Sequence, residues 1–472
     1  MKLLLAFLFF CFAEAEIARL RLSQRGLDYA ATVSRQVLQN DAKIVGVRIP
    51  SFSKSVLKFY GGSITQFTSP NFRITAKSPN RLEFRSSGGQ VKAEGRGRVK
   101  IAFIKNKFTA YATATNLRMT MLTALTRTGA GKLSLSPQSC STSIGSVSLR
   151  IRGKGLARVL NWFRKRIASE MKKQLNRRLC DELKKVIRNK ANSWLASADL
   201  SIPVMRDTKL TLSLAKNPSM VRWMDLVFNG AIKMGSSRPV SVPGVSMPGS
   251  SLSSKMLYAW LTDSAINGAL KSAHTAGKIS YTISRSKLPS GSASKLRTTC
   301  TGGGLIPECI GGILPTMGAK YPNTYAYLVL KSREAPTISF KPGKATIQLK
   351  ARLEVRVENP RGAQAFAGNL DFSGDIRARV KTSGGRVVVS GELLQGSGDI
   401  SLDITESAIG EEVKEVVPAL VELGEPLILH EMNKELKEGY KLPTMKWVDI
   451  TEPGVAFEDR LVRVEASVVY KP

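Results

Sequence analysis

Long runs of alternating apolar and polar residues dominate the chain. The clearest run covers residues 345–358, "ATIQLKARLEVRVE", in which every second residue from Ala345 to Val357 is apolar. Alternation with a period of two predicts a strand that buries one face. At about 3.3 Å per residue this strand would run roughly 45 Å, far beyond the usual strand length. Residues 111–125 and 460–472 alternate in the same way, so both halves of the chain are expected to contain long one-sided strands.

A second pattern, with apolar residues three or four apart, predicts long helices. The first such stripe comprises Leu156, Leu160, Phe163, Ile167, Met171, Leu175, Leu179, Leu183 and Val186. Its length is typical of a helix packed on a core. Residues 409–439 form a comparable stripe, interrupted by Pro418 and Pro426. Long twisted strands curl into tubes, and a helix laid along a tube would enclose an elongated apolar interior.

Two segments without such patterns organise the chain. Residues 236–254, "SSRPVSVPGVSMPGSSLSS", are rich in proline, glycine and serine, which predicts a semi-extended linker between an amino-terminal domain, 16–235, and a carboxyl-terminal domain, 255–472. Residues 1–15 combine one lysine, a short apolar run and Ala13-x-Ala15, as in a secretory signal peptide. The mature protein is therefore expected to be secreted and extracellular.

Charge changes this picture because it is distributed unevenly. The formal net charge is +35. Residues 16–235 contain 41 Lys/Arg against 11 Asp/Glu, a net of +30, whereas residues 255–472 contain 28 against 24, a net of +4. No acidic residue lies between Glu94 and Glu170, an interval that holds fifteen Lys/Arg. This asymmetry indicates that the amino-terminal domain meets a polyanionic partner.

The segment "VKAEGRGRVKIAFIKNKFTA" (91–110) supplies the main candidate site. Gly95, Gly97 and the break at residues 105–107 predict strands that meet at a basic turn. The turn would gather at one end of the first tube Arg96, Arg98, Lys100, Lys105 and Lys107. Such side chains bind phosphate well, and several together multiply the attraction. A merely soluble loop is the alternative, and the absence of nearby acids favours phosphate binding.

The helix at 156–187 carries a further set of basic residues on the surface opposite its apolar stripe. They include Arg158, Arg164, Lys165 and Arg166. We expect this helix to be mainly core with a cationic outer face, and its charges to add to the positive field of the domain.

The cysteines and histidines restrict the chemistry. Cys11 lies in the signal peptide, and four cysteines remain for an oxidising compartment, with three possible pairings. Pairing within each half, Cys140 with Cys180 and Cys300 with Cys309, is expected. A zinc site is the weaker interpretation because the chain has no CxxC spacing and two histidines. With no G-x-S-x-G or Walker motif either, we expect no enzyme, no metal and no cofactor.

Four segments together carry a resemblance to a known family. They are "QRGLDYA" with "VRIPSFS" (47–53), the strand and helix joined by Cys140 and Cys180, the junction at 255–270, and residues 433–444 with the closing "ASVVYK". In this order and spacing they resemble the bactericidal/permeability-increasing and lipopolysaccharide-binding protein family, which includes the plasma lipid transfer proteins. The Cys300–Cys309 pair is not part of that pattern and suggests a divergent, invertebrate-like lineage.

The resemblance implies an α+β fold. The expected shape is an elongated boomerang of two similar tubular domains, each a long twisted antiparallel sheet with long helices, joined by a central sheet. It also implies a phospholipid bound in an apolar pocket of each tube, and lipid A phosphates bound at the basic tip. The pseudo-repeat of strands and helices in the two halves agrees with this shape.

The function expected from these observations is innate-immune binding of lipopolysaccharide at the bacterial outer membrane surface, with an antibacterial or neutralising effect. The alternative is an extracellular phospholipid transfer or carrier protein, although a pure carrier does not need a net charge of +30 on one half. We expect a monomer, heparin-like polyanions as side partners, and no specific nucleic acid.

Overall fold

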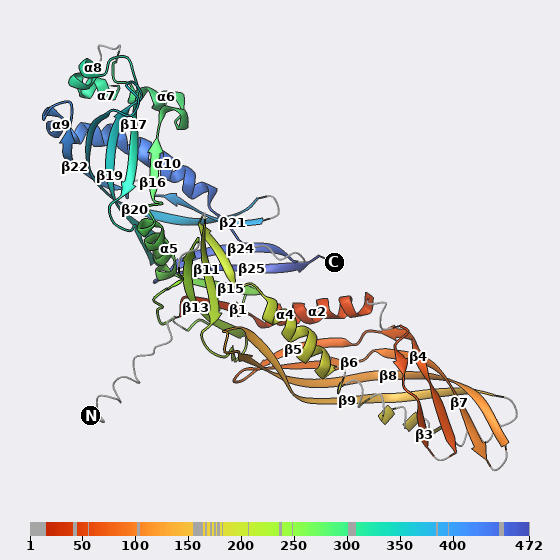
Figure 1. The fold of residues 1–472 in the computed structure, drawn as a ribbon. Helices are drawn as coiled ribbons and strands as arrows, with labels where there is room; N and C mark the ends of the chain where they lie inside the picture. The colour runs from red at the N-terminus through yellow and green to blue at the C-terminus, as the bar shows by residue number, and fades with distance from the viewer. Residues whose placement is uncertain are drawn as a thin grey trace, which may run out of the picture.

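The computed structural model describes most of the chain after the first 15 residues. The described residues are 16–40, 45–54, 56–101, 104–153, 164–165, 168–169, 172–173, 176, 180–181, 183–205, 207–235, 238–247, 249–300, 308–383, 386–394, 396–442 and 448–471. The molecule is elongated, with the amino-terminal strands at one end, the carboxyl-terminal strands at the other and a third sheet between them (Figure 1). The predicted signal peptide, 1–15, lies outside the described residues.

The amino-terminal sheet is entirely antiparallel, with the path β2-β4-β7-β8-β6-β5, and β3 and β9 attached to β4 and β8. Its strands are β2 (Arg48–Ile49), β3 (Phe52–Lys54), β4 (Leu57–Thr68), β5 (Asn71–Lys77), β6 (Arg81–Ser87), β7 (Gln90–Ile101), β8 (Ile104–Arg127) and β9 (Leu133–Arg152). Strand β8 contains the predicted strand at 111–125 and extends it at both ends. Helix α2 (Gln24–Asn40) packs against β5.

The carboxyl-terminal sheet repeats this plan with the path β16-β17-β19-β20-β21-β23, and with β18 and β22 attached to β19 and β20. Its strands are β16 (Ser280–Ile283), β17 (Ala326–Ser332), β18 (Thr337–Lys341), β19 (Lys344–Val357), β20 (Gln364–Ser383), β21 (Arg386–Leu393), β22 (Asp399–Ser407) and β23 (Tyr440–Lys441). Strand β19 confirms the predicted strand at 345–358. It alternates as expected at its buried end, where Ala351, Leu353 and Val355 point into the core.

Helices cover the inner face of this second sheet. The longest is α10 (Val417–Glu438), preceded by α9 (Glu412–Glu415). Pro418 lies in the first turn of α10, where a missing N–H does no harm, whereas Pro426 lies inside the helix. Short helices close the far end of the tube: η3 (Arg285–Lys287), α6 (Ser290–Ala293), η4 (Ser294–Leu296), α7 (Ile310–Ile313) and α8 (Pro315–Lys320).

The central sheet joins the two halves and contains strands from both. Its path is β10-β11-β13-β1-β15-β25-β24, with β12 and β14 attached to β13. The strands are β1 (Ala18–Leu22), β10 (Ser201–Met205), β11 (Thr208–Leu214), β12 (Ser219–Met220), β13 (Met224–Met234), β14 (Val240–Ser241), β15 (Leu257–Thr262), β24 (Val448–Glu458) and β25 (Leu461–Tyr470). Helix α5 (Asp263–Thr275) follows β15 and packs on this sheet through Ala265 and Ala269.

The fold class is confirmed: two curled sheets with long helices are joined by a central sheet. The domain boundaries at 235 and 255 stay a prediction. Within the segment predicted as a semi-extended linker, Val240 and Ser241 form a two-residue strand that pairs with β13. This pairing is compatible with its prolines, since a two-residue strand at a sheet edge leaves Pro239 and Pro243 outside the ladder.

A candidate anion-binding face and an apolar cavity

Strands β7 and β8 form a hairpin that brings the five predicted basic residues together. In its register Arg98 lies opposite Lys107 and Lys100 lies opposite Lys105. Residues directly opposite in an antiparallel pair point to the same side of the sheet. Arg96 lies two positions from Arg98 and therefore points the same way. All five side chains thus share the outer face near the free end of the amino-terminal sheet (Figure 1).

Two neighbouring strands add three basic residues that the sequence analysis missed. Lys58 of β4 pairs with Arg98, so that Lys58, Arg98 and Lys107 form one row across three strands. On the other side, β9 places Arg152 opposite Thr109 and Arg150 opposite Tyr111. We call the eight residues the basic sheet face: Lys58, Arg96, Arg98, Lys100, Lys105, Lys107, Arg150 and Arg152. The spacing of Arg150 and Arg152 predicts that both side chains lie on the same face of their strand. The residues beside them come from β8, through a pairing that the local sequence does not reveal.

The basic sheet face has little compensating charge. Glu94, opposite Tyr111, is the acidic residue nearest in register, and no ion pair to the eight cations occurs among the residues that the structure describes. Two exposed tyrosines complete the surface. The Lys58 Nζ lies 5.9 Å from the Tyr60 ring centroid, and the Arg152 guanidinium lies 5.5 Å from that of Tyr111. This surface presents cations and amphipathic rings together, which suits a phosphorylated headgroup at an apolar boundary.

The equivalent face of the carboxyl-terminal sheet pairs most of its cations with carboxylates. Lys331 and Arg356 lie 3.0 and 2.8 Å from carboxylate oxygens of Glu354. Further pairs join Lys350 to Glu334 at 3.1 Å and Arg333 to Asp371 at 2.8 Å, and Arg352 pairs with Glu406. Burial alone would raise the pKa of Glu354, but hydrogen bonds from Lys331 and Arg356 outweigh it and hold that pKa below its ordinary value. Among the described residues, the eight cations of the basic sheet face therefore have no ion pair, whereas most cations on the outer face of the carboxyl-terminal sheet have one.

Glycines explain how the hairpin closes on its inner side. Gly95 and Gly97 are buried strand residues, where a Cβ atom would lie 2.3 Å from the Phe59 ring and 2.5 Å from the Phe108 ring. The predicted break at residues 105–107 was wrong, because these residues continue β8. The glycines therefore make room for aromatic rings in the inner core, and the chain reverses between Ile101 and Ile104.

The basic helix is anchored to β9. Cys140 forms a disulfide with Cys180, with a Cα–Cα distance of 5.8 Å, and the Thr142 hydroxyl donates to the Asn176 carbonyl at 2.9 Å. Arg164 and Lys165 are helical and exposed, as expected for an outer face. Arg158, Arg166 and most of the apolar stripe lie outside the described residues. The helix continues as η2 (Val186–Ala191) and α4 (Asn192–Ser197).

The second expected disulfide is also present. Cys300 and Cys309 are bonded, with a Cα–Cα distance of 6.2 Å, beside the short helices at the far end of the carboxyl-terminal tube. Cys309 is buried and directly precedes α7, so the bond fixes the start of this helical cap.

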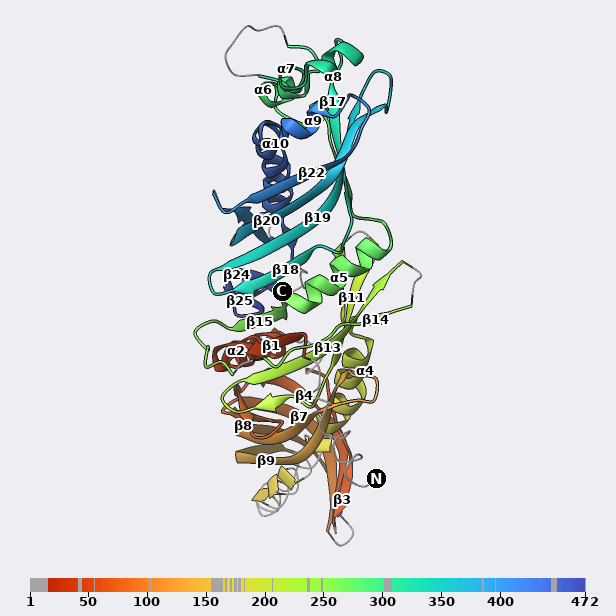
Figure 2. The same cartoon turned by 90° about the vertical axis from the view of Figure 1, so that its left-hand side faces the viewer.

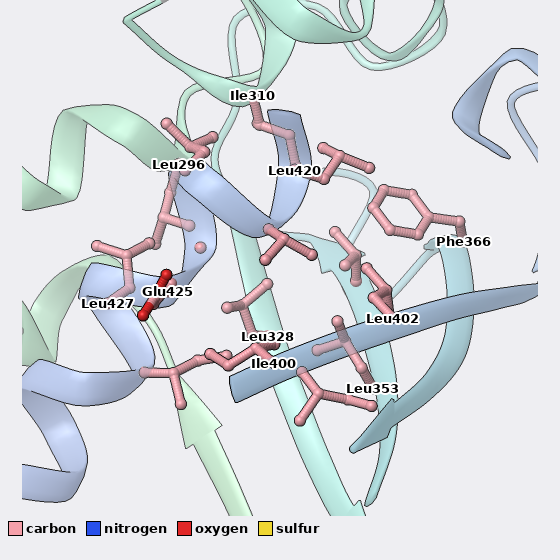
Figure 3. Close-up of a pocket in the computed structure, with 16 residues that line it drawn as sticks. Leu296, Ile310, Leu328, Leu353, Phe366, Ile400, Leu402, Leu420, Glu425 and Leu427 are labelled. Carbon is pink, nitrogen blue, oxygen red and sulfur yellow. The ribbon is translucent and has the colours of Figure 1, made fainter. Parts of the chain in front are cut away.

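An apolar cavity lies between α10 and the inner face of the carboxyl-terminal sheet (Figure 3). Leucine, isoleucine and phenylalanine side chains from both elements converge on it, among them Leu328, Phe366 and Leu427. Among the described residues that line it, Glu425 is the one that carries a charge. The cavity volume is about 50 Å³. This is far below the roughly 300–1,000 Å³ of typical ligand pockets, so a phospholipid would require α10 to move away from the sheet.

The described residues include no group of three or more His, Cys, Asp or Glu side chains that could hold a metal ion.

No helix among the described residues combines the length and the hydropathy that a membrane span requires.

Comparisons with known proteins agree with this architecture. The family model "LBP / BPI / CETP family, C-terminal domain" matches residues 207–470, and the model of the N-terminal domain matches residues 26–190. The lipopolysaccharide-binding protein of Homo sapiens is 22% identical over 463 residues, covering 95% of this chain and 93% of that protein. The bactericidal permeability-increasing protein of Sebastes schlegelii is 21% identical over 440 residues, covering 90% and 89%.

A solved structure supports the fold independently. The crystal structure of lipopolysaccharide binding protein superposes with a TM-score of 0.58 at 20% identity, and the match covers 97% of this chain and 100% of that one. With one family model covering more than half of the chain and a second covering most of the remainder, the protein belongs to the LBP / BPI / CETP family.

Proposed function

We propose that this protein is a secreted innate-immune protein that binds lipopolysaccharide through the basic sheet face, with an antibacterial or neutralising effect on Gram-negative bacteria. The observation that carries the proposal is the contrast between the two sheets. The basic sheet face holds eight cations without an ion pair in the described structure, while the carboxyl-terminal face pairs most of its cations with carboxylates. Relatives named for lipopolysaccharide binding support the ligand.

The arrangement of the cations matches the chemistry of lipid A. A phosphate accepts several charge-assisted hydrogen bonds. The row Lys58, Arg98 and Lys107 offers three cationic side chains at the spacing of neighbouring strands. Rows on either side can engage a second phosphate. Tyr60 and Tyr111 supply apolar surface beside the charges, where acyl chains begin.

A lipid transfer or carrier activity is the second candidate, and the apolar cavity beside α10 favours it. We propose that each tube holds a phospholipid in the loaded state. In the second tube the cavity of about 50 Å³ would then be the collapsed form of a larger site. Transfer of a fluorescent phospholipid between vesicles measures this activity directly, without lipopolysaccharide.

Two triple variants of the full chain, each changing the net charge equally, test the main proposal. The first replaces Arg98, Lys100 and Lys107 with Glu, and the second replaces Arg164, Lys165 and Arg166 with Glu. With contacts of about 1 kcal/mol each, the first should weaken binding to lipid A vesicles by roughly 100-fold or more. The second should weaken it by only a few-fold, through the long-range field.

Thermal denaturation checks that both triple variants are folded. If the sheet-face variant binds lipid A as tightly as the wild type, or if the helix variant loses more affinity, the basic sheet face is not the binding site. The complete reversal of Arg96, Arg98, Lys100, Lys105 and Lys107 should abolish binding while folding persists, because these side chains point away from the core.

A further inference from the structure

A large open cleft lies where the two halves meet, separate from the basic sheet face and from the cavity beside α10. Its volume is about 1050 Å³. Helix α5 forms the floor, β13 and β14 with the following linker residues form one wall, and β18 and β19 form the other. Figure 2 shows α5 running between these two groups of strands. The volume is at the top of the range of roughly 300–1,000 Å³ for small-ligand sites, which allows a chain of several rings.

Close packing and hydrogen bonds hold the floor helix, α5, against both walls. Gly268 of α5 faces Val242, and a Cβ atom there would lie 3.2 Å from a Val242 methyl and 2.9 Å from one of Ile232. On the opposite side, the Asn267 amide donates to the Ile338 carbonyl at 2.9 Å and accepts from the Ile338 N–H at 2.7 Å. The helix is thus fixed to both walls, and the cleft has a defined width.

Short polar side chains line the cleft and offer both donors and acceptors. The Ser272 and Thr275 hydroxyls donate to carbonyls of their own helix, which leaves their oxygens free to accept. Gln348 accepts from Thr337, so its amide N–H groups remain available. Ser241 and Ser339 add one hydroxyl on each wall. A mostly apolar surface that also carries hydrogen-bond donors and acceptors suits the C–H faces and hydroxyls of sugar rings.

The charged side chains of the lining favour an anionic ligand. Four cations, Arg238, Lys271, Lys278 and Arg460, face one carboxylate, Asp263. Asp263 is buried and is paired with Arg460 at 3.7 Å, while its N–H donates to the Arg460 carbonyl. No ion pair to Lys271 or Lys278 is present among the described residues, and both are exposed. The cleft therefore carries a surplus of positive charge that the protein itself leaves uncompensated.

We propose that this cleft binds an anionic oligosaccharide, a chain of sugar rings bearing phosphate or sulfate groups, with Lys271 and Lys278 as the principal contacts to the anionic groups. The open mouth and the surplus of cations favour a water-soluble anionic ligand over a lipid chain. Among the described residues, the lining has no aromatic side chain on which bases could stack, which disfavours single-stranded nucleic acid. The inference is independent of lipid A binding at the tip.

The test uses the full chain with Arg98→Gln, Lys100→Gln and Lys107→Gln, so that the basic sheet face contributes little. Isothermal titration calorimetry measures three probes: a heparin-derived hexasaccharide, a phosphorylated core oligosaccharide freed of lipid A, and the neutral sugar maltohexaose. In this background Lys271→Gln with Lys278→Gln should weaken binding of the anionic probe about tenfold or more. Ser339→Trp, which blocks the cleft without changing charge, should do the same.

The probes distinguish the natural source of the ligand. Preference for the sulfated hexasaccharide points to a host-type glycan, and preference for the phosphorylated one points to the sugar part of lipopolysaccharide. The proposal is overturned if neither anionic probe binds, if maltohexaose binds equally well, or if either cleft variant keeps its affinity within twofold. Lipid A binding by the same cleft variants on the wild-type background should be unchanged, which keeps the two sites separable.

Discussion

Arg21 and Asp225 form a two-point ion pair inside the central sheet. The Arg21 Nε and Nη2 donate to Asp225 Oδ1 and Oδ2 at 2.7 and 2.8 Å. The Arg21 side chain is 2% exposed, and its guanidinium lies 4.0 Å from the Trp223 ring centroid. The remaining donor, Nη1, reaches the carbonyls of Ser250 and Leu252. One residue therefore ties the first strand to β13 and to the linker.

Asp225→Asn should destabilise the protein strongly. It leaves the Arg21 charge buried without a counter-charge, and breaking such a pair costs about 3–5 kcal/mol. Urea denaturation of the full chain measures this loss. Glu334→Gln removes the exposed partner of Lys350 and should cost at most about 1 kcal/mol. Equal losses in the two variants would show that the buried pair has no special role.

Lys107→Thr should raise stability while lowering affinity for lipid A. Lys107 lies opposite Arg98, and like charges directly opposite one another destabilise a sheet. Threonine favours strands, so the free energy of unfolding should rise by roughly 0.2–1 kcal/mol. Arg352→Thr on the other sheet breaks the pair with Glu406 and should have no such benefit. A fall in the melting temperature for Lys107→Thr would contradict the view that repulsion between Lys107 and Arg98 destabilises this face in the absence of a ligand.

Acid should destabilise the carboxyl-terminal sheet. Burial alone would raise the pKa of Glu354, but the hydrogen bonds and positive charges of Lys331 and Arg356 together lower it from its ordinary 4.5. A carboxyl group with a lowered pKa in the folded state stabilises the protein above pH 4.5, and this contribution is lost as the pH falls through the lowered value. The melting temperature of the full chain, measured from pH 7 down to pH values below 4.5, should show this loss of stability.

The matching variant for the acid experiment is Lys331→Ala. It removes one of the two hydrogen-bonding partners that lower the pKa of Glu354, so the loss of stability should begin at higher pH than in the wild type. Identical pH profiles in the two proteins would mean that other carboxylates govern the acid response.

Pro426→Ala should make phospholipid uptake slower. Pro426 deprives α10 of one backbone hydrogen bond beside the cavity, where the helix would have to bend or move to admit lipid. Alanine restores the bond and favours a continuous helix by up to ~3 kcal/mol. Uptake of a fluorescent phospholipid from vesicles gives the rate. Pro418→Ala, in the first turn, is the control and should behave as the wild type; equal rates in all three proteins would exclude Pro426 as a hinge.

Strands that face one core can be predicted from local sequence, whereas features that depend on contacts between strands cannot. The alternation at 345–357 depends on side chains of one strand facing one core, so it was visible in the sequence. Lys105 and Lys107 also alternate with their neighbours in β8, but Gly95 and Gly97 nearby favour the prediction of a break in the strand. Their real reason is space for Phe59 and Phe108, which come from other strands. Lys58 joins the site through pairing between β4 and β7, a register that no local pattern contains.

The position of β1 has a consequence for how the molecule is made. This strand, Ala18–Leu22, pairs on one side with β13 and on the other with β15, whose residues lie beyond the linker. During synthesis at 5–20 residues per second, roughly 10–50 s pass between the appearance of β1 and of β15. Throughout that interval the β15 edge of β1 lacks its native neighbour, and the other edge lacks β13 for most of it. Open edges invite pairing with other chains. A ribosome-bound chain stopped near residue 240 should therefore depend on chaperones, a dependence that ends once residue 262 has emerged.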